Sequence, residues 1–358
     1  MKLGDVCDSV SVTFDKTKQQ VVLINTSDVL EGEVTNHILV DNKGLKGQFK
    51  KTFQKNDILY SEIRPKNRRF AYIDFDSDNY VASTKLMVIR ANNRVLPQYL
   101  YQILKSEKVI NQLQSLAESR SGTFPQITFS ELAQIDVYIP ELSEQKEIAD
   151  FLKLFDDKIE NNKKINHHLE QIGTIIWQER FNNQVPNGVL GDIASISSGK
   201  RPPIKTTEPT DGVKIPIIGA SSIMGYTDKI LYNHKILVTG RVGTHGIIQR
   251  YQRSCWPSDN TLVLQSDFYE FVYQVLKHID FKTLNRGSTQ PLITQTDLNK
   301  SELYIPSISE LLDFETLVGT QMKQYEQNNL ENEILFALRD TLLPKLLSGE
   351  ITINQAAK

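Results

Sequence analysis

The stretch Tyr138-Ile139-Pro140-Glu141-Leu142-Ser143-Glu144 occurs again as Tyr304-Ile305-Pro306-Ser307-Ile308-Ser309-Glu310, at an offset of 166 residues. After each copy, apolar residues recur every three or four positions, a period typical of an amphipathic helix. A duplication at a fixed offset indicates a repeated structural unit. The sequence therefore predicts two similar halves, each made of a globular domain followed by a long helix.

The duplication divides the 358 residues into four expected segments. Leu3-Gly4-Asp5 and Leu190-Gly191-Asp192 open the two globular domains, and Pro186-Asn187-Gly188 breaks the first helix. The expected segments are a first globular domain over residues 1–141, a first long helix over 142–185, a second globular domain over 186–306, and a second long helix with a C-terminal tail over 307–358.

Each globular domain is predicted to have an α+β or mixed α/β fold. Runs of aliphatic residues predict strands at 21–24, 57–60 and 81–89 in the first domain and at 235–238 and 261–264 in the second. Pro97 and Asp267 open predicted helices that run to about residues 117 and 279. A last strand is expected to end at Pro140 and at Pro306, and the order of strands in the sheets stays open.

The two long helices are expected to pair. A helix from Ser143, a natural N-cap like Ser309, to about Phe181 would be about 60 Å long, too long to bury its apolar stripe on one small domain. We therefore expect an antiparallel two-helix coiled coil that separates the two domains, in a pseudo-two-fold internal repeat. The residues expected to pair the helices are Leu152, Phe155, Ile159, Asn162, Asn166, Leu169, Val318, Tyr325, Asn328, Asn332 and Leu335.

Four asparagines within this set leave two interpretations open. Asn162 and Asn166 recur as Asn328 and Asn332 at the same offset. Polar residues in a helix seam lower stability but fix register and partner choice. Asparagines on a helix can equally face solvent. Their recurrence in both copies favours the register role.

The composition is that of a globular protein, with 39% hydrophobic and 23% charged residues. No apolar run is long enough to span a bilayer, and the N-terminus lacks a signal-peptide pattern, so a cytoplasmic protein is expected. Cys7 and Cys255 are expected to be reduced thiols. The net charge is −2, but the globular segments carry +1 and +3 and the helical segments −2 and −4. Any contact to DNA is therefore expected from the globular domains.

A search for catalytic motifs finds no phosphate-binding loop and no dinucleotide-binding glycine pattern. His167-His168 lies within a predicted helix, where adjacent side chains point to different faces, so a metal site is not expected. No nucleophile with a matching base can be nominated. The sequence is typical of a binding protein.

Basic residues cluster in predicted loops, where arginine and lysine suit phosphate contact and arginine can read guanine edges. Each residue taken singly is more simply ordinary solvated surface. A second shared feature, Arg120-Ser121-Gly122-Thr123 with its echo at 286–289, either orients the last strand or contacts nucleic acid. The candidate DNA-binding residues are Arg64, Lys66, Arg68, Arg69, Arg120, Thr123, Lys200, Arg201, Lys205, Arg241, Arg250, Arg253, Arg286 and Thr289.

These features together resemble the specificity (S) subunit of type I restriction-modification systems. The resemblance rests on the two Leu-Gly-Asp openings, the Ile24–Val29 stretch, the paired Arg-x-x-Thr loops, the two helix entries and the C-terminal Leu342–Ile351. It implies two target-recognition domains that each read half of a bipartite DNA sequence, with the helices setting the gap. It also implies two modification (methyltransferase) subunits and restriction (nuclease/translocase) subunits as partners. S-adenosylmethionine, ATP and magnesium are expected on those partners, and neither cofactor nor metal on this chain.

Two other classes of function remain as alternatives. One is a coiled-coil scaffold whose globular domains bind proteins. The other is an enzyme with its own nuclease or methyltransferase activity, which the missing motifs disfavour. The resemblance favours a DNA-recognition subunit whose complex methylates adenine at N6 through other chains.

Overall fold

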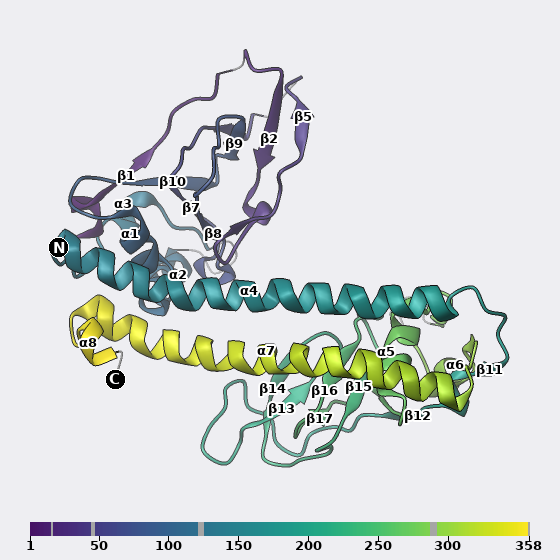
Figure 1. Cartoon of the computed structure of the whole chain (residues 1–358). Helices are drawn as coiled ribbons and strands as arrows, with labels where there is room; N and C mark the ends of the chain where they lie inside the picture. The colour runs from purple at the N-terminus through teal and green to yellow at the C-terminus, as the bar shows by residue number, and fades with distance from the viewer. Residues whose placement is uncertain (16, 44–46, 121–124, 287–291, 357–358) are drawn as a thin grey trace. The chain divides into compact units, whose positions relative to one another are not determined.

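The computed structural model of the chain describes residues 1–15, 17–43, 47–120, 125–286 and 292–356 (Figure 1). It separates into two compact units. The first unit contains residues 1–161 and 331–358, and the second contains residues 162–330. Each unit thus combines one globular region with about half of each long helix.

The described residues of the first unit form ten short strands. They are β1 (Cys7–Val10), β2 (Gln20–Ile24), β3 (Val29–Leu30), β4 (Glu33–Val34), β5 (Leu39–Asp41), β6 (Phe49–Lys51), β7 (Ile58–Ser61), β8 (Phe70–Tyr72), β9 (Tyr80–Ser83) and β10 (Leu86–Ala91). Its helices are η1 (Leu3–Asp5), η2 (Thr26–Asp28), η3 (Pro65–Asn67), α1 (Pro97–Leu104), α2 (Glu107–Arg120), α3 (Phe129–Leu132), parts of α4 (Leu142–Phe181) and α7 (Ile308–Ser348), and α8 (Ile353–Ala356).

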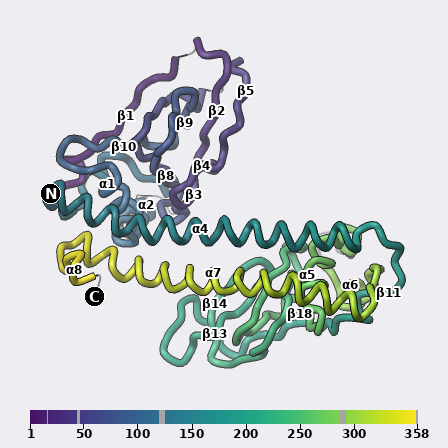
Figure 2. The backbone as a smooth tube through the Cα atoms, viewed as in Figure 1, coloured from purple at the N-terminus to yellow at the C-terminus, as the bar shows by residue number. Residues whose placement is uncertain are grey.

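The second unit contains the remaining elements, whose path can be followed in Figure 2. Its strands are β11 (Gly188–Val189), β12 (Ser195–Ser198), β13 (Ile215–Ile218), β14 (Ile223–Thr227), β15 (Ile236–Gly240), β16 (Gln249–Tyr251), β17 (Trp256–Pro257), β18 (Thr261–Gln265) and β19 (Glu302–Leu303). Its helices are η4 (Leu190–Asp192), α5 (Tyr269–His278), α6 (Gln295–Asn299) and the remaining parts of α4 and α7.

The two units repeat one sheet topology. The first has an antiparallel sheet in the order β1-β10-β7-β8, and the second has the order β12-β18-β15-β16. Each unit also has a second sheet built around one parallel pair, β2 with β9 and β13 with β17. The mixed α/β fold and the internal repeat predicted from the sequence are therefore confirmed.

The core of the first unit lies between its first sheet and the helices. Leu100 and Ile103 of α1 are buried with Leu152 of α4 and with Leu343 and Leu346 of α7. Each fully buried aliphatic side chain of this kind contributes about 1.5–3 kcal/mol to stability. The C-terminal end of α7 is therefore part of the core of the first unit.

In the second unit, the core includes aromatic side chains from three helices. Phe181 of α4, Phe271 of α5 and Phe314 of α7 are all buried, and their ring centroids lie 5.4–6.1 Å apart in edge-on pairs. Such edge-to-face packing adds to the free energy of burial. The three helices are thereby held together on one side of the sheet.

Helices α4 and α7 run antiparallel within each unit, as the sequence predicts. In the first unit the Lys158 ammonium lies 3.1 Å from the Glu331 carboxylate, and Arg339 reaches back to Asp156. In the second unit Asn328 bonds to Asn166, and Arg180 pairs with Asp313 at 2.6 Å. In both units, residue numbers rise along α4 while those of the α7 partners fall.

Several local predictions are wrong. The strand expected over 81–89 is two strands, β9 and β10, in different sheets, and the helix expected over 97–117 is broken between α1 and α2. The last strand before Pro140 is only an isolated bridge, and its counterpart is the two-residue β19. Helix α7 is capped by Ser307 rather than Ser309, because Ser307 Oγ and the Glu310 carboxylate accept each other's backbone N–H.

Among the helices of the described residues, none is both long enough and apolar enough to cross a membrane. Cys7 and Cys255 are free and buried, and burial raises the pKa of each thiol to about 12. Both therefore stay protonated at neutral pH.

Candidate nucleic-acid interface

In the second unit, several loops gather at one end of the β12-β18-β15 part of the sheet. Neighbouring strands are antiparallel, so the end of β12, the start of β18 and the end of β15 lie together. The Gly199 N–H donates to the Thr261 carbonyl (3.1 Å), and the Arg241 N–H donates to the Asn260 carbonyl (2.8 Å). These bonds hold the basic segment that begins at Lys200 beside the loop that begins at Arg241. We call this region the second loop end.

Gly199 allows the close approach of two of these loops. A Cβ built on it would lie 2.1 Å from the Ser258 carbonyl oxygen and 2.5 Å from that of Pro257. Both contacts are with backbone, which cannot move aside as a side chain can. The adjacent Lys200 is held on both sides, since its N–H donates to Pro257 and its carbonyl accepts from the Trp256 indole N–H. The backbone at Lys200, from which the basic segment continues to Arg201, is therefore held in place.

The first unit has the same arrangement at the end of β7 and the start of β10. The Glu62 N–H donates to the Lys85 carbonyl (3.0 Å), and the Ile127 N–H donates to the Glu62 carbonyl (2.8 Å). The Arg64 N–H donates to the Pro125 carbonyl at 3.1 Å. The segment 64–69, which contains Arg64, Lys66, Arg68 and Arg69, follows this strand end. We call this region the first loop end.

Two of the backbone bonds recur at both loop ends, and in the first of them the Arg241 N–H donates to the Asn260 carbonyl as the Glu62 N–H donates to the Lys85 carbonyl. Ile293 donates to the Arg241 carbonyl as Ile127 donates to that of Glu62. Both bonds anchor the segment that follows an Arg-x-x-Thr loop. Thr123 and Thr289 lie outside the described residues, and only the backbone of Arg120 is described. A nucleic-acid role for these loops therefore stays a prediction.

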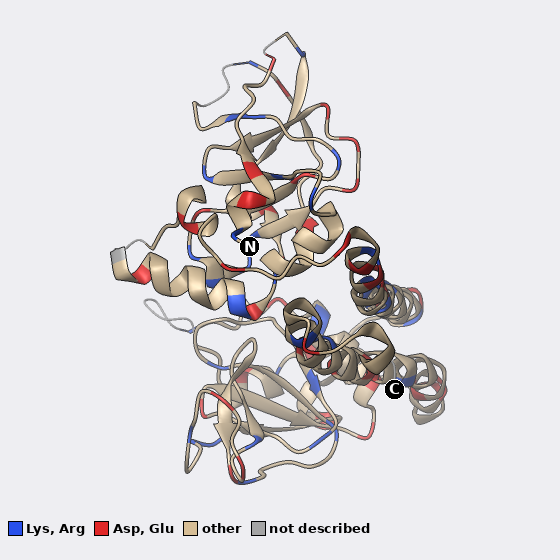
Figure 3. Ribbon diagram, turned by 90° about the vertical axis from the view of Figure 1, so that its left-hand side faces the viewer, with Lys and Arg blue, Asp and Glu red and all other residues tan. Residues whose placement is uncertain are grey.

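The predicted DNA-binding residues differ in exposure. Arg68, Arg69 and Arg241 are partly exposed. The exposed residues are Arg64, Lys66, Lys200, Arg201, Lys205, Arg253 and Arg286. Lys and Arg are interspersed with Asp and Glu along the ribbon of both units, including the long helices (Figure 3). Local geometry, rather than a wholly basic face, therefore distinguishes the two loop ends.

Arg68, Arg69 and Arg286 have side-chain partners among the described residues. Arg68 pairs with Glu107 and lies 3.8 Å from Glu31. The Arg69 guanidinium donates to the Ser27 and Val29 carbonyls. Arg286 pairs with Asp297 while most of its side chain stays exposed. The first two serve the local structure, whereas Arg286 keeps surface available to a ligand.

Arg250 lies in a buried ion-pair network instead of a surface loop. Its side chain is 5% exposed and makes two bonds, of 2.6 and 2.9 Å, to Glu270, which is 3% exposed. Glu326 of α7 accepts from its Nε at 3.2 Å. Burial alone would lower the pKa of Arg250, but these carboxylates outweigh it and raise the pKa above its usual range. We therefore leave Arg250 out of the proposed DNA interface.

Glu315 of α7 caps the start of α5 in the same unit. Its carboxylate accepts the Phe271 N–H (2.8 Å) and the Glu270 N–H (3.2 Å). Burial raises the pKa of Glu315 to about 7, although the two hydrogen bonds lower it. The negative charge of Glu270 raises this pKa further, and the positive charge of Lys235 lowers it. At neutral pH this position is therefore close to its titration midpoint.

Replacing Glu315 with glutamine should stabilise the second unit as the pH rises. A carboxyl whose pKa is raised from 4.5 to about 7 by folding contributes stability below pH 4.5, and that contribution is lost as pH rises through 7. Glutamine stays neutral and still offers an acceptor to Phe271. We expect Glu315→Gln to be more stable than wild type by about 2 kcal/mol at pH 8 and equal to it near pH 5, by thermal unfolding. The exposed control Glu302→Gln should differ from wild type in stability by the same amount at every pH. The same pH-independent difference for Glu315→Gln would contradict the prediction.

The residues predicted to pair the long helices are all buried or partly buried. Leu152, Ile159 and Val318 are buried with all four asparagines, and Phe155, Leu169, Tyr325 and Leu335 are partly buried. The alternative in which the asparagines face solvent therefore does not hold.

Within the second unit, one asparagine network crosses between the helices. The Asn328 amide donates to Asn166 Oδ1 at 2.8 Å, and the Asn166 amide donates to Asn329 Oδ1 at 2.8 Å and to the Tyr325 carbonyl at 3.2 Å. A shift of one helix along the other would leave these buried amides without partners. The network therefore suits the predicted register role.

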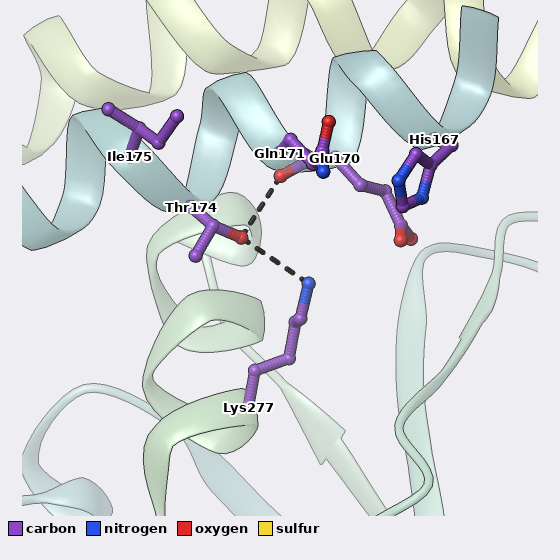
Figure 4. Close-up of a pocket in the computed structure, with 6 residues that line it drawn as sticks. All are labelled: His167, Glu170, Gln171, Thr174, Ile175 and Lys277. Atoms are coloured by element: carbon purple, nitrogen blue, oxygen red, sulfur yellow. Dashed lines mark hydrogen bonds between the residues drawn. The ribbon is translucent and has the colours of Figure 1, made fainter. Parts of the chain in front are cut away.

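A groove lies between α4 and α5 in the second unit (Figure 4). Thr174 Oγ1 donates to the Glu170 carbonyl at 3.0 Å, and Lys277 Nζ donates to Thr174 Oγ1 at 3.3 Å. The Tyr273 hydroxyl donates to the Glu170 carboxylate at 2.9 Å. These polar groups bond to one another. The groove is therefore explained by the packing of α5 on α4. Among the described residues, no cluster of His, Cys, Asp or Glu could hold a metal ion.

Two residues of the loop ends were not predicted from the sequence. Lys85 lies between β9 and β10, where a continuous strand was expected, and its ammonium donates to Gln126 Oε1 at 3.0 Å. Asn260 holds the corresponding place in the second unit through its carbonyl. The sequence does contain a signal for this turn between two strands, because the polar triplet Ser83-Thr84-Lys85 interrupts the apolar run.

Comparisons with known proteins agree with this architecture. The family model described as type I restriction modification DNA specificity domain matches residues 1–171 and again residues 185–342. The type I restriction enzyme HindI specificity subunit of Haemophilus influenzae is 30% identical, over 98% of both chains. The MjaIX specificity subunit of Methanocaldococcus jannaschii is 24% identical, over 88% of this chain and 82% of that protein.

A solved structure shares the fold. The type I restriction-modification system S subunit from M. genitalium aligns over 97% of this chain and 95% of its own, with a TM-score of 0.56 and 17% sequence identity. The two family matches fall one on each half of the internal repeat, and together they cover most of the chain. The chain therefore belongs to the family of type I restriction-modification DNA specificity subunits.

Proposed function

We propose that this chain recognises a bipartite DNA target, with each unit reading one half-site at its loop end. The observation that carries the proposal is the repeated pattern of backbone bonds at the two loop ends. The same framework presents Ile63-Arg64-Pro65-Lys66 in one unit and Val242-Gly243-Thr244 in the other. A shared framework with different side chains suits two readers of different sequences.

The long helices are proposed to set the gap between the half-sites and to bind two modification subunits. Two modest DNA contacts held at one spacing gain affinity together only when both half-sites lie at that spacing. Adenine methylation and cleavage are assigned to the modification and restriction subunits in the cytoplasm. S-adenosylmethionine, ATP and magnesium are assigned to those chains, and this chain is proposed to be non-catalytic.

A scaffold that binds only proteins is the competing function. The test reconstitutes the chain with its modification subunit, supplies S-adenosylmethionine and genomic DNA, and maps methylated adenines by sequencing. Methylation confined to one bipartite motif is the expected result. Methylation without a motif, together with equal retention of duplexes of random sequence, would favour the scaffold. Methylation by this chain alone would establish an enzyme.

Removing two charges at the second loop end should weaken DNA binding at every sequence. Lys200 and Arg201 are exposed on a segment with a fixed backbone, which suits phosphate contact. For Lys200→Ala/Arg201→Ala we expect the slope of log affinity against log salt to become shallower by about 2, since each phosphate contact contributes about 0.9. The exposed pair Lys229 and Lys300 provides the matched control. An unchanged slope would exclude the two residues as phosphate contacts.

A further inference from the structure

Arg64 adopts a backbone conformation that its residue type disfavours. Its φ is 44° and its ψ is 77°, in the left-handed region, and it directly precedes Pro65. Left-handed backbone crowds the Cβ of any residue but glycine, and a following proline restricts the preceding residue further. The position is therefore strained for an arginine.

The second unit has a glycine at the corresponding place. Ile63 forms an isolated bridge with Gln126, and Val242 forms one with Leu292. The next residue is Arg64 in the first unit and Gly243 in the second. Gly243 has a φ of 83°, so both units use left-handed backbone at this turn, and only the second uses the residue that adopts it without cost.

The contacts of Arg64 with the described residues do not explain the arginine. Its backbone N–H bonds to the Pro125 carbonyl, a bond that glycine would make equally well. Its side chain is exposed, and no hydrogen bond or ion pair joins it to another described residue. Arg68, four residues later, is also left-handed at a φ of 51°, but its guanidinium pairs with Glu31 and Glu107. Among the described residues, Arg68 therefore has side-chain partners that favour an arginine, and Arg64 has none.

We infer that Arg64 is a specificity-determining residue, whose guanidinium reads one base of the half-site bound by the first unit. The inference rests on the proposed DNA-recognition function. Backbone strain without an internal partner is typical of functional positions. A planar guanidinium can make two hydrogen bonds to a guanine edge. This contact requires the guanidinium to lie at one position relative to the base.

A fixed backbone distinguishes base reading from phosphate contact. A phosphate accepts a flexible charge from many directions, as exposed Lys66 would supply from the same turn. The strained turn at Arg64 instead constrains where its side chain leaves the backbone, and the bond to Pro125 keeps it there. Such constraint is useful for a contact to a single base edge.

The test compares Arg64→Gly with wild type in the complex with the modification subunit. Glycine suits the backbone, so the melting temperature should equal or exceed that of wild type. Arg64→Asn, which also tolerates left-handed backbone, provides a second variant. Mapping of methylated adenines should show one position of one half-site relaxed, with discrimination there reduced by about tenfold to a hundredfold. The other half-site and the gap should be unchanged.

Three outcomes are distinguishable. An unchanged motif in both variants would overturn the role of Arg64, as would a uniform loss of methylation at all positions, which indicates a phosphate contact. A wild-type complex without a bipartite motif would instead overturn the proposed function. Arg94→Gly, an exposed charge removed at the opposite end of β10, is the matched control and should leave the motif intact.

Discussion

Replacing Arg250 with alanine should lower the free energy of unfolding of the second unit by about 3–5 kcal/mol, the range for breaking a buried ion pair on one side. The change leaves Glu270, 3% exposed, without its two hydrogen bonds, and Glu326 without its contact. A buried carboxylate that loses its counter-charge keeps the full cost of its desolvation. The loss should therefore far exceed that of an exposed ion pair.

The guanidinium of Arg250 also packs on three aromatic rings. Its central carbon lies 4.9 Å from the ring of Tyr269, 4.7 Å from that of Tyr273 and 5.8 Å from that of Tyr325. These rings come from α5 and α7, and Arg250 comes from β16. Its removal thus loosens the contact between the sheet and both helices.

Tryptophan fluorescence during urea unfolding measures this loss selectively. The chain has two tryptophans, Trp177 and Trp256, and both belong to the second unit. Lys229→Ala, at an exposed site, is the control and should change stability little. The double variant Arg250→Leu/Glu270→Leu should recover part of the loss, because it removes the orphaned charge. A loss below about 1 kcal/mol for Arg250→Ala would show that the network adds no more than a surface pair.

Arg250 also shows what sequence patterns leave out. Its charge and its place near a glycine-rich hairpin predicted a DNA contact. Its partners lie 20 and 76 residues further along the chain, and only the fold brings them together. The strand predicted over 81–89 failed for a related reason, since apolar character does not show that Thr84 and Lys85 carry the chain from one sheet to another.

Features that depend on the duplication were predictable. Each half has to bury a similar apolar stripe, so the repeat predicts that both units share one fold, and it predicts the helix pair and its direction, without knowledge of distant contacts. The buried asparagines belong to this class, because their recurrence separated them from solvated positions. The left-handed conformation of Arg64 does not, since nothing in its local sequence requires it.

Removing four residues from each long helix should shorten the preferred gap by about one base pair. The segments to delete are 163–166 of α4 and 328–331 of α7, which together contain Asn166, Asn328 and Asn329 and so leave none of these three amides without its partner. Four residues of helix correspond to about 6 Å and to about 40° beyond a full turn. One base pair corresponds to about 3.4 Å and about 35° of twist.

The rotation decides the size of the change. Each unit has to face its own groove, so the twist lost from the helices has to match the twist lost from the DNA, and a change of one base pair satisfies this best. Mapping of methylated adenines should then show both half-sites unchanged and separated by a shorter gap. Asn166→Leu/Asn328→Leu, which keeps the helix length, is the control and should keep the wild-type gap. An unchanged gap in the deletion variant would contradict the spacer role, because the DNA spacing would then be set by something other than helix length.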